Sequence, residues 1–425
     1  MACFTITHSQ YGGTLLFPQW LLPVVQSRPF QRLYGISQLG AAAYTGIVPL
    51  YSRAEHSLGV AHLALRLVEQ LRTRQPALGI SDLDVRCVTI AGLLHDIGHA
   101  PCSHDAEGLR EELGVPDWTH EEQSVLLLAY VPLSRRARRR VAAMIRGAPE
   151  DDSDDSDGTG ETAKRRSFLY EIVHNKRTGF DVDRWDYLER DEATTAAQGS
   201  TGLAELLLRA TLVTVTDGIS RLSHRAYAIP LIAEALRARV RLHSTVSRSP
   251  RADGATLAWQ DAVLASRRAR RQLQRAWRDP VAFLTLTDAT LAVKAWQPYA
   301  CVLKISDSSD SSDQWAPSDP SDGSVQVIAN AITEQGRAHG FARFSHVRVK
   351  RFRTDHGLGD ANPLDHMHFV GPGGFPQPWT AFNSAEELGL PARLSFAELR
   401  VYSTTEPRCK QVQTAAVLWA SGDIA

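Results

Sequence analysis

Six of the chain's fifteen histidines fall between positions 56 and 120, and this clustering constrains the fold more than any other feature of the sequence. They are His56, His62, His95, His99, His104 and His120. Asp96 directly follows His95, and Asp183 stands further along the chain. A divalent cation in a protein is commonly held by imidazole nitrogens and carboxylate oxygens from several elements. The pattern therefore favours a fold that brings distant parts of the chain to one point.

Hydrophobic spacing predicts that these elements are helices. Apolar residues at helical intervals predict a helix over 56–71, on which His62 is expected to be a surface or core residue. A second helix is expected from about Val85 to His95, before the breakers Gly98 and Pro101. Neighbouring residues on an ideal helix point about 100° apart, so His95 and Asp96 can meet one ion best where the helix ends.

Further helices are expected along the first two thirds of the chain. Thr119 and Glu122 form a capping-box pattern that predicts a helix over 119–130, and an arginine-rich helix is expected over 135–146. A helical block to about residue 208 is followed by a hairpin that turns at Asp217 and Gly218. The remaining helices are expected over 228–243 and 257–277.

The last third of the sequence indicates a different architecture. Short runs rich in β-formers cover 289–296, 299–305, 324–330 and 344–352. The fold class is therefore mainly α, with a helical core over 1–290 and a smaller C-terminal α+β lobe over 291–425.

Two acidic stretches interrupt this pattern. Residues 147–163 contain seven acids and no base, and residues 305–324 contain five acids and no base. Such segments bury too little apolar surface to order themselves, so disordered loops are expected. Lys plus Arg and Asp plus Glu each number 47, so the rest of the chain is net basic and suited to anionic substrates.

Composition excludes several classes of protein. No apolar run approaches the roughly 20 residues that span a bilayer, and the N-terminus lacks the features of a signal peptide. The five cysteines are scattered without a CxxC pair, which argues against a disulfide framework or a thiolate zinc site. We expect a soluble intracellular protein of the nucleus or cytoplasm, without a membrane partner, whose metal is held by His and carboxylate.

Several segments resemble the HD-domain phosphohydrolases, and within them the dNTP triphosphohydrolase branch. The likeness is strongest to the eukaryotic enzymes that join a sterile-alpha-motif domain to an HD domain. It is carried by RAEHSLGVAHLA (53–64), AGLLHDIGHAPCSH (91–104), THEEQSVLLL (119–128) and EIVHNKRTGFDVDRWDYLERD (171–191). Segments 31–40, 355–369 and 398–402 extend it in the same order, so it covers most of the chain, without a sterile-alpha-motif domain.

The resemblance implies a reaction and a set of site residues. A deoxynucleoside triphosphate would be hydrolysed to deoxynucleoside and inorganic triphosphate with a divalent metal, which can be Fe, Mn, Zn or Mg. The implied metal ligands are His56, His95, Asp96 and Asp183. His99, His104 and His120 would surround the α-phosphate, with His104 as the acid that protonates the leaving oxygen and His120 orienting it. Glu107 stands where the family usually has Asp.

Substrate-binding residues follow from the same resemblance. Arg53 and Arg184 would contact phosphates, because a guanidinium matches paired oxygens. Tyr187 would lie under the sugar, Asp191 and Gln38 would bind the 3′-hydroxyl, and Leu39 would contact the sugar or base. A structural alternative is that Trp185, Asp186, Arg190 and Asp191 form only a helix-face salt bridge and core.

The sequence departs from the family at two further places. Thr245, Ser249 and Asp253 stand where the family has an Arg, a His and a Tyr that grip the triphosphate, and Pro250 and Gly254 are expected to interrupt that helix. Arg248 and Arg251 are candidate replacements. At the family's guanine-nucleotide activator site, Gln26 and Tyr34 replace an acidic residue and an arginine, so homo-oligomer formation driven by nucleotides is only weakly supported.

Two other functions stay open. One is an HD enzyme acting on a nucleoside monophosphate or another phosphoester. The other is a binding protein with little turnover that holds nucleotides or single-stranded nucleic acid through the arginines of 135–146 or 267–278.

Overall fold

The computed structural model describes residues 2–148, 161–194, 202–293, 296–306, 322–341, 347–390, 395–404 and 409–421. Most of both acidic stretches, residues 149–160 and 307–321, lies outside the described residues. The ends of these stretches belong to regular elements, because α8 begins at Glu161, β5 ends at Ser306 and α15 begins at Asp322.

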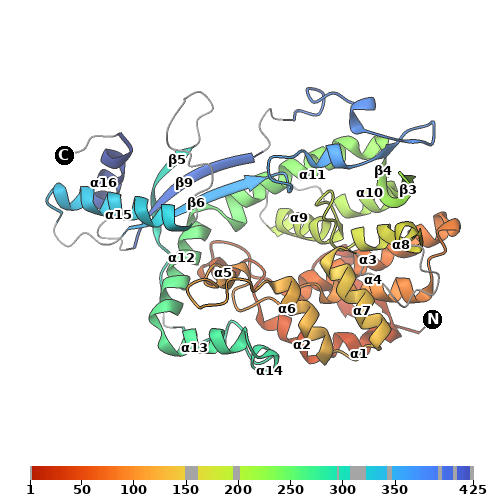
Figure 1. Ribbon diagram of the computed structural model, residues 1–425, viewed down its shortest axis with the longest axis horizontal. Coiled ribbons are helices and arrows are strands. Elements are labelled where there is room, and N and C mark those ends of the chain that lie inside the picture. The colour runs from red at the N-terminus through yellow and green to blue at the C-terminus, as the bar shows by residue number, and fades with distance from the viewer. Residues whose placement is uncertain are drawn as a thin grey trace.

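The chain is mainly α, as predicted, with a smaller part that contains several strands (Figure 1). The helices are α1 (Leu22–Val25), α2 (Arg28–Arg32), α3 (Arg53–Arg74), α4 (Asp82–Leu94), α5 (His104–Glu107), α6 (His120–Leu127), α7 (Arg135–Arg146), α8 (Glu161–Arg166), α9 (Val182–Thr194), α10 (Leu203–Ala210), α11 (Ile229–Leu242), α12 (Pro250–Ala265), α13 (Arg267–Ala276), α14 (Pro280–Phe283), α15 (Asp322–Ala338) and α16 (Cys409–Ser421). None of these described helices combines the length and apolar composition needed to cross a bilayer.

Within the described residues the strands form three sheets. They are β1 (Cys3–Thr7) with β2 (Thr14–Pro18); β3 (Thr211–Thr216), β4 (Ile219–Arg225), β7 (Phe369–Val370) and β8 (Pro376–Gln377); and β5 (Ala300–Ser306), β9 (Ser395–Ser403) and β6 (Val347–Asp355). The predicted hairpin is β3–β4, in which Thr216 pairs with Ile219. Asp217 and Gly218 both have positive φ, as a two-residue turn of type I′ requires.

The large hydrophobic core is built around α3 and α4, which pack along each other. The apolar stripe predicted for α3 is buried, including Leu63, Leu67 and Leu71. Ser81 begins α4 with a complete capping box to Asp84, which satisfies backbone donors of the first turn. Because both helices are fixed on the core, their ends can hold functional side chains rigidly.

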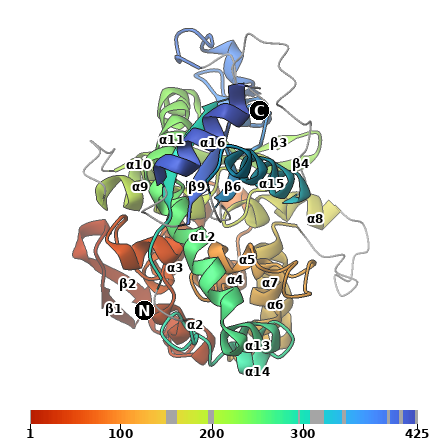
Figure 2. The same cartoon turned by 90° about the vertical axis from the view of Figure 1, so that its left-hand side faces the viewer.

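A second, smaller core lies where α15 and α16 cover the sheet of β5, β9 and β6 (Figures 1 and 2). It contains Ile332, Val349, Val401, Val412 and Ala416. Figure 2 shows α12 running between this sheet and the end of the molecule that carries α13 and α14. Residues 363–390 return to the large core, where Phe369 and Leu364 are fully buried and β7 pairs with β4.

Several sequence predictions in the last half of the chain are wrong. Residues 324–330 lie in helix α15, not in a strand, because Val325, Ile328, Ala329 and Ile332 follow helical spacing and face the small core. The described residues of 289–296 form no strand. The single helix expected over 257–277 is two helices, which Ser266 separates.

Pro250 and Gly254 do not interrupt a helix as predicted. Pro250 is the first residue of α12, a position where proline loses no hydrogen bond, and the Ser249 side chain caps the helix. Gly254 lies inside α12, where an added Cβ would be 2.1 Å from the Tyr299 carbonyl oxygen. Glycine is needed here because the 299 segment approaches the helix closely.

Candidate functional site

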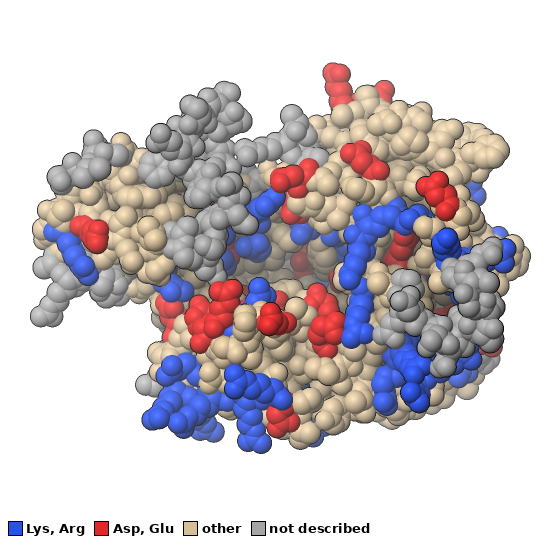
Figure 3. Space-filling model, viewed as in Figure 1, with Lys and Arg blue, Asp and Glu red and all other residues tan. Residues whose placement is uncertain are grey.

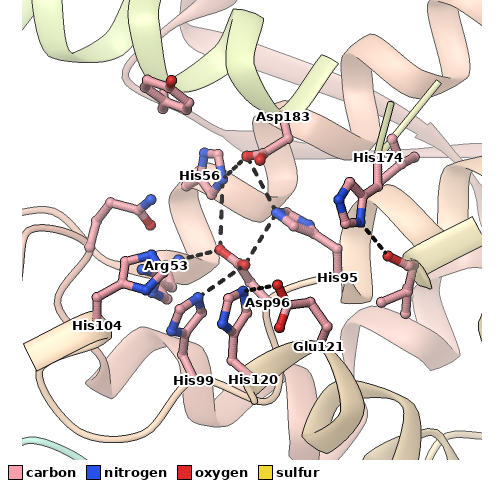
Figure 4. Close-up of a pocket in the computed structure, with 14 residues that line it drawn as sticks. Arg53, His56, His95, Asp96, His99, His104, His120, Glu121, His174 and Asp183 are labelled. Atoms are coloured by element: carbon pink, nitrogen blue, oxygen red, sulfur yellow. Dashed lines mark hydrogen bonds and ion pairs between the residues drawn. The ribbon is translucent and has the colours of Figure 1, made fainter. Parts of the chain in front are cut away.

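The ends of three helices converge on one cavity (Figure 4). His56 stands in the first turn of α3, which Ser52 caps. His95 is the C-cap of α4, and Asp183 stands in the first turn of α9. The helix therefore ends at His95, as the sequence predicted from Gly98 and Pro101.

The first group of side chains, here called the metal cluster, consists of His56, His95, Asp96 and Asp183. Asp183 Oδ1 lies 2.9 Å from His56 Nε2 and 3.5 Å from His95 Nε2. Asp96 Oδ1 lies 3.3 Å from His95 Nε2, and Asp96 Oδ2 lies 3.7 Å from His56 Nε2. Two imidazoles and two carboxylates thus face one another, and Asp96 also forms a buried ion pair with Arg53.

The donor set fits a divalent cation. His95 Nδ1 donates to the Gly92 carbonyl at 2.9 Å, which leaves Nε2 to face the two carboxylates. That Nε2 atom is buried and has no hydrogen-bond partner among the described residues. A buried nitrogen that faces two carboxylates in this way would suit a cation that accepts its lone pair. These residues suit several first-row ions and do not distinguish between them.

The charges of the metal cluster depend on one another. Burial lowers the pKa of His56, but the carboxylates of Asp183 and Asp186 outweigh burial and raise that pKa to about 10. Burial raises the pKa of Asp183, but His56 and His95 outweigh it and hold that pKa well below its ordinary value. Protons and a divalent cation therefore compete for the same atoms.

A second group, here called the histidine cluster, consists of His99, His104, Glu107 and His120 and lies beside the first. Glu107 Oε1 is 2.9 Å from His120 Nδ1, and Oε2 is 3.3 Å from His104 Nδ1. The rings of His99 and His120 stack with centroids 4.0 Å apart. His99 Nε2 is 3.3 Å from Asp96 Oδ1, which joins the two clusters.

Glu107 sets the charge of the histidine cluster. Burial lowers the pKa of His120, but Glu107 outweighs burial and raises it. Burial and the neighbouring Arg53 and His120 hold the pKa of His99 well below its ordinary value. The side chain of His104 is 64% exposed, so it can meet a substrate atom in the cavity. The longer carboxylate at position 107 still reaches both imidazoles.

The loop between the clusters has a strained backbone. Cys102 and Ser103 have φ values of 56° and 57°, which are unusual for residues other than glycine. Asp288 Oδ1 accepts a hydrogen bond from the Cys102 amide at 2.7 Å, and Ser103 Oγ accepts one from Arg53 Nε at 2.6 Å. These contacts hold the chain in a conformation that places His104 directly after the loop.

The metal cluster occupies a cavity of about 230 Å³, and a larger cavity of about 720 Å³ adjoins it. The two cavities share Gln38, Arg53, His104, Glu121 and Tyr187 in their walls. The larger cavity has a size typical of small-molecule sites. The six residues predicted to bind substrate all line it: Gln38, Leu39, Arg53, Arg184, Tyr187 and Asp191.

Two of these residues have polar atoms that could accept a hydrogen bond from a hydroxyl group. Gln38 Oε1 is buried and has no hydrogen-bond partner within the described part of the chain. Asp191 Oδ1 accepts a hydrogen bond from Tyr51 at 2.5 Å, and burial raises the pKa of Asp191 to about 6. Asp191 therefore carries a charge near neutral pH.

Sequence reasoning missed one residue at the metal cluster. Asp186 forms the salt bridge to Arg190 that the structural alternative proposed, at 3.0 Å, but it also lies 2.8 Å from His56 Nδ1. The neighbouring Trp185 belongs to the core. The available signal was spacing, because Asp186 stands three residues after Asp183 and shares its helix face. The larger cavity also includes Arg239, His243 and Lys350, which no sequence motif indicated.

The sequence of the chain is similar to a known family model and to several known proteins. Residues 53–221 match the family model of the HD domain. Over 198 residues, the chain is 40% identical to the "Deoxynucleoside triphosphate triphosphohydrolase SAMHD1" of Bos taurus, an alignment that covers 42% of this chain and 33% of that protein. The protein of the same name from Homo sapiens is 40% identical over 189 residues, which are 40% of this chain and 30% of that protein.

A longer alignment links the chain to a protein of Dictyostelium discoideum. The "Deoxynucleoside triphosphate triphosphohydrolase SAMHD1 homolog" of that organism is 25% identical over 429 residues, covering 95% of this chain and 78% of the relative. The chain thus spans about a third of the length of the mammalian relatives and most of the length of this one.

Proposed function

Since the chain carries an HD domain and is homologous to proteins named as dNTP triphosphohydrolases, we propose that it is a metal-dependent dNTP triphosphohydrolase. The proposed products are a deoxynucleoside and inorganic triphosphate. The observation that carries the proposal is the convergence of His56, His95 and Asp183 beside the histidine cluster, in a cavity that adjoins a larger one of about 720 Å³.

The metal cluster supplies the cation site. His56, His95, Asp96 and Asp183 would hold the ion, which when bound polarises a phosphoryl oxygen. Arg53 is buried against Asp96, so its charge lies between the cation site and the larger cavity. We assign it, with Arg184, to the α-phosphate.

The histidine cluster supplies the proton. His104 is the exposed imidazole of the cluster and lines both cavities, so we assign it as the acid that protonates the departing 5′ oxygen. The Glu107 carboxylate would orient His104 together with His120, while His99 and His120 would lie against the α-phosphate. His104 and Glu107 lie within ion-pair distance, which is the geometry that this assignment requires.

The remaining assignments concern the sugar. Tyr187 would lie against the ring, Leu39 against the sugar or base, and Gln38 and Asp191 would bind the 3′-hydroxyl. Asp191, which carries a charge at neutral pH, would accept that hydrogen bond through its carboxylate.

The test is incubation of the purified protein with each dNTP and Mn, Mg, Fe or Co, with products separated by chromatography. Deoxynucleoside and inorganic triphosphate are expected from wild type and not from Asp183→Asn. No such products with any of these metals would overturn the proposal. Orthophosphate released from a deoxynucleoside monophosphate, with dNTPs untouched, would instead support the monophosphatase alternative.

A second activity is favoured by the surface of α13. Arg267, Arg268, Arg270, Arg271 and Arg275 are all exposed on this helix. Figure 3 shows basic side chains gathered at the lower left, where Figure 1 places α13. We propose single-stranded nucleic acid as its ligand. We expect salt-dependent binding of an oligonucleotide that persists in the Asp183→Ala variant. The double variant Arg268→Gln, Arg271→Gln should lose this binding. Unchanged binding in the double variant would contradict the proposal.

The cellular location, the domain division and the assembly of the protein are further parts of this proposal. The substrate class implies action inside the cell, in the nucleus or cytoplasm. The division into a catalytic core over 1–290 and a C-terminal lobe over 291–425, and assembly into a homo-oligomer, likewise stay proposals.

A further inference from the structure

His174 is a histidine of the smaller cavity that belongs to neither cluster. It lines that cavity together with Ile145 and Val173. Figure 4 shows its ring on the opposite side of the metal cluster from His104. His104 lines both cavities, whereas His174 lines only the smaller one. His174 therefore stands at the end of the site away from the larger cavity, and it has no role in the steps assigned to the two clusters.

A backbone carbonyl fixes the tautomer of His174. Its Nδ1 atom lies 2.9 Å from the Ile145 carbonyl oxygen. A carbonyl oxygen can only accept a hydrogen bond, so Nδ1 carries the proton, and Nε2 of the neutral imidazole keeps its lone pair. Among the described residues, Nε2 has no hydrogen-bond partner. The ring is therefore able to accept a proton on Nε2.

Two helices hold this ring in place. The carbonyl that it contacts lies in the last turn of α7, where carbonyl groups have no partner within the helix. Gly147 caps α7 with a positive φ, and an added Cβ would lie 2.4 Å from the His174 carbonyl oxygen and 3.2 Å from Cγ of its ring. On the other side, the Asn175 amide donates at 2.8 Å to Asp181, which directly precedes α9. His174 is thus fixed between the end of α7 and the beginning of α9.

We propose that His174 is the general base that takes a proton from the attacking water. In displacement at phosphorus, the attacking and leaving oxygens lie roughly in line on opposite sides of the phosphorus atom. His104, the acid assigned to the leaving oxygen, and His174 lie on opposite sides of the metal cluster (Figure 4). One imidazole is therefore available on each side of the reacting phosphorus. This role rests on the proposed function.

The proton transfers balance with this assignment. Water loses one proton to Nε2 of His174 while its oxygen forms a bond to the α-phosphorus. The bond between that phosphorus and the 5′ oxygen breaks, and His104 gives its proton to the 5′ oxygen. His174 then releases its proton to solvent and His104 takes one up, so each turnover consumes one water molecule and restores both imidazoles.

The variant His174→Asn separates this role from a structural one. Its side-chain amide can still donate to the Ile145 carbonyl, but no atom replaces Nε2. We expect kcat on a dNTP to fall by at least about 100-fold, as for a lost general base, with KM, Tm and Mn²⁺ content unchanged. The matched control is His339→Asn, because His339 is an exposed histidine whose Nδ1 also contacts a helix carbonyl, that of Gln335 at 3.0 Å. It should retain the activity of wild type.

Two further measurements test the chemistry itself. Imidazole added to His174→Ala should restore part of the lost kcat, because a free base can take the place of the missing ring. The variants are also assayed on bis-p-nitrophenyl phosphate, whose leaving group departs without a proton although the water must still lose one. On this ester the loss in His174→Asn should persist, whereas the loss in His104→Asn should become smaller.

The outcomes distinguish this role from the proposed function. Hydrolysis of a dNTP by His174→Asn with the kcat of wild type would overturn the role of His174 and leave the proposed function standing. Loss of Mn²⁺ from that variant, without rescue of His174→Ala by imidazole, would also overturn the role, since His174 would then be a metal ligand. If wild type cleaves only the ester and His174→Asn does not, the role is retained and the proposed function is overturned. A wild type that cleaves neither substrate overturns both.

Discussion

His56 Nδ1 lies 2.8 Å from the carboxylate of Asp186, a side chain with no exposed surface. A carboxylate in this position accepts the Nδ1 proton and leaves Nε2 free to face Asp183 and a cation. Asp186 itself accepts a hydrogen bond from Tyr11 at 2.8 Å and is paired with Arg190. The tautomer and orientation of a proposed metal ligand are thus fixed by a residue of α9 that does not reach the cavity.

Asp186→Asn should weaken metal binding by about 10- to 100-fold, because the amide cannot stabilise the His56 proton as a carboxylate does. The measurement is titration with Mn²⁺ followed by metal analysis. Tyr11→Phe is the control, since it removes one hydrogen bond to Asp186 and keeps the carboxylate. Equal metal affinity in Asp186→Asn and wild type would show that Asp186 serves only the fold.

Metal affinity should rise with pH. The pKa of His56 is raised to about 10, so its imidazole is protonated at neutral pH in the metal-free chain and must release that proton to bind an ion. Affinity for Mn²⁺ should therefore increase by about tenfold per pH unit between pH 6 and 8. Calorimetry in buffers of different ionisation enthalpy would measure the released proton.

The control for this experiment is His62→Gln. His62 lies on the same helix but packs on Tyr11 and Phe17, and burial lowers its pKa to about 4. It is therefore neutral in this range, and its replacement should leave the slope unchanged. A Mn²⁺ affinity in wild type that does not depend on pH would contradict the prediction.

Glu107→Gln should lower kcat by about 100-fold and move the alkaline limb of the pH profile to lower pH. The carboxylate raises the pKa of His120, and an amide would allow this imidazole, which we place against the α-phosphate, to lose its proton and its attraction for the phosphate at lower pH. Glu107→Asp keeps the charge and restores the residue usual in the family, so its alkaline limb should stay close to that of wild type. A Glu107→Gln profile that coincides with wild type would remove Glu107 from the proposed mechanism.

Gly98→Ala should destabilise the protein and displace His120. An added Cβ would lie 2.1 Å from the His120 carbonyl oxygen and 2.4 Å from the Ser124 amide nitrogen, both backbone atoms of α6. Overpacking of this kind costs about 1–3 kcal/mol. Urea denaturation of Gly98→Ala and Gly373→Ala would measure it, because Gly373 has no atom within 4 Å of an added Cβ. Equal stability of the two variants would refute the argument.

The sequence by itself determined the helices of the site and the residues at their ends. Some features can be recognised in the sequence because each depends on neighbours within a few residues. They are the cap at Ser81, the apolar stripe of α3 and the hairpin turn at Asp217 and Gly218. Family motifs added the proposed metal ligands and the proposed substrate residues. The 324–330 segment was assigned wrongly because its β-forming residues also follow helical spacing, and only packing on the small core selects the helix.

Tertiary structure alone decided which distant residues meet at the cavity. His56 and Asp186 are 130 residues apart, and Lys350 and Asp253 are 97 residues apart, so no local pattern relates them. Their contacts follow from how α9 packs on α3 and how β6 approaches α12. Local hydrogen bonds and hydrophobic periodicity specify single helices and strands. The charged side chains that meet in a buried site depend instead on which helices and strands pack together in the cores.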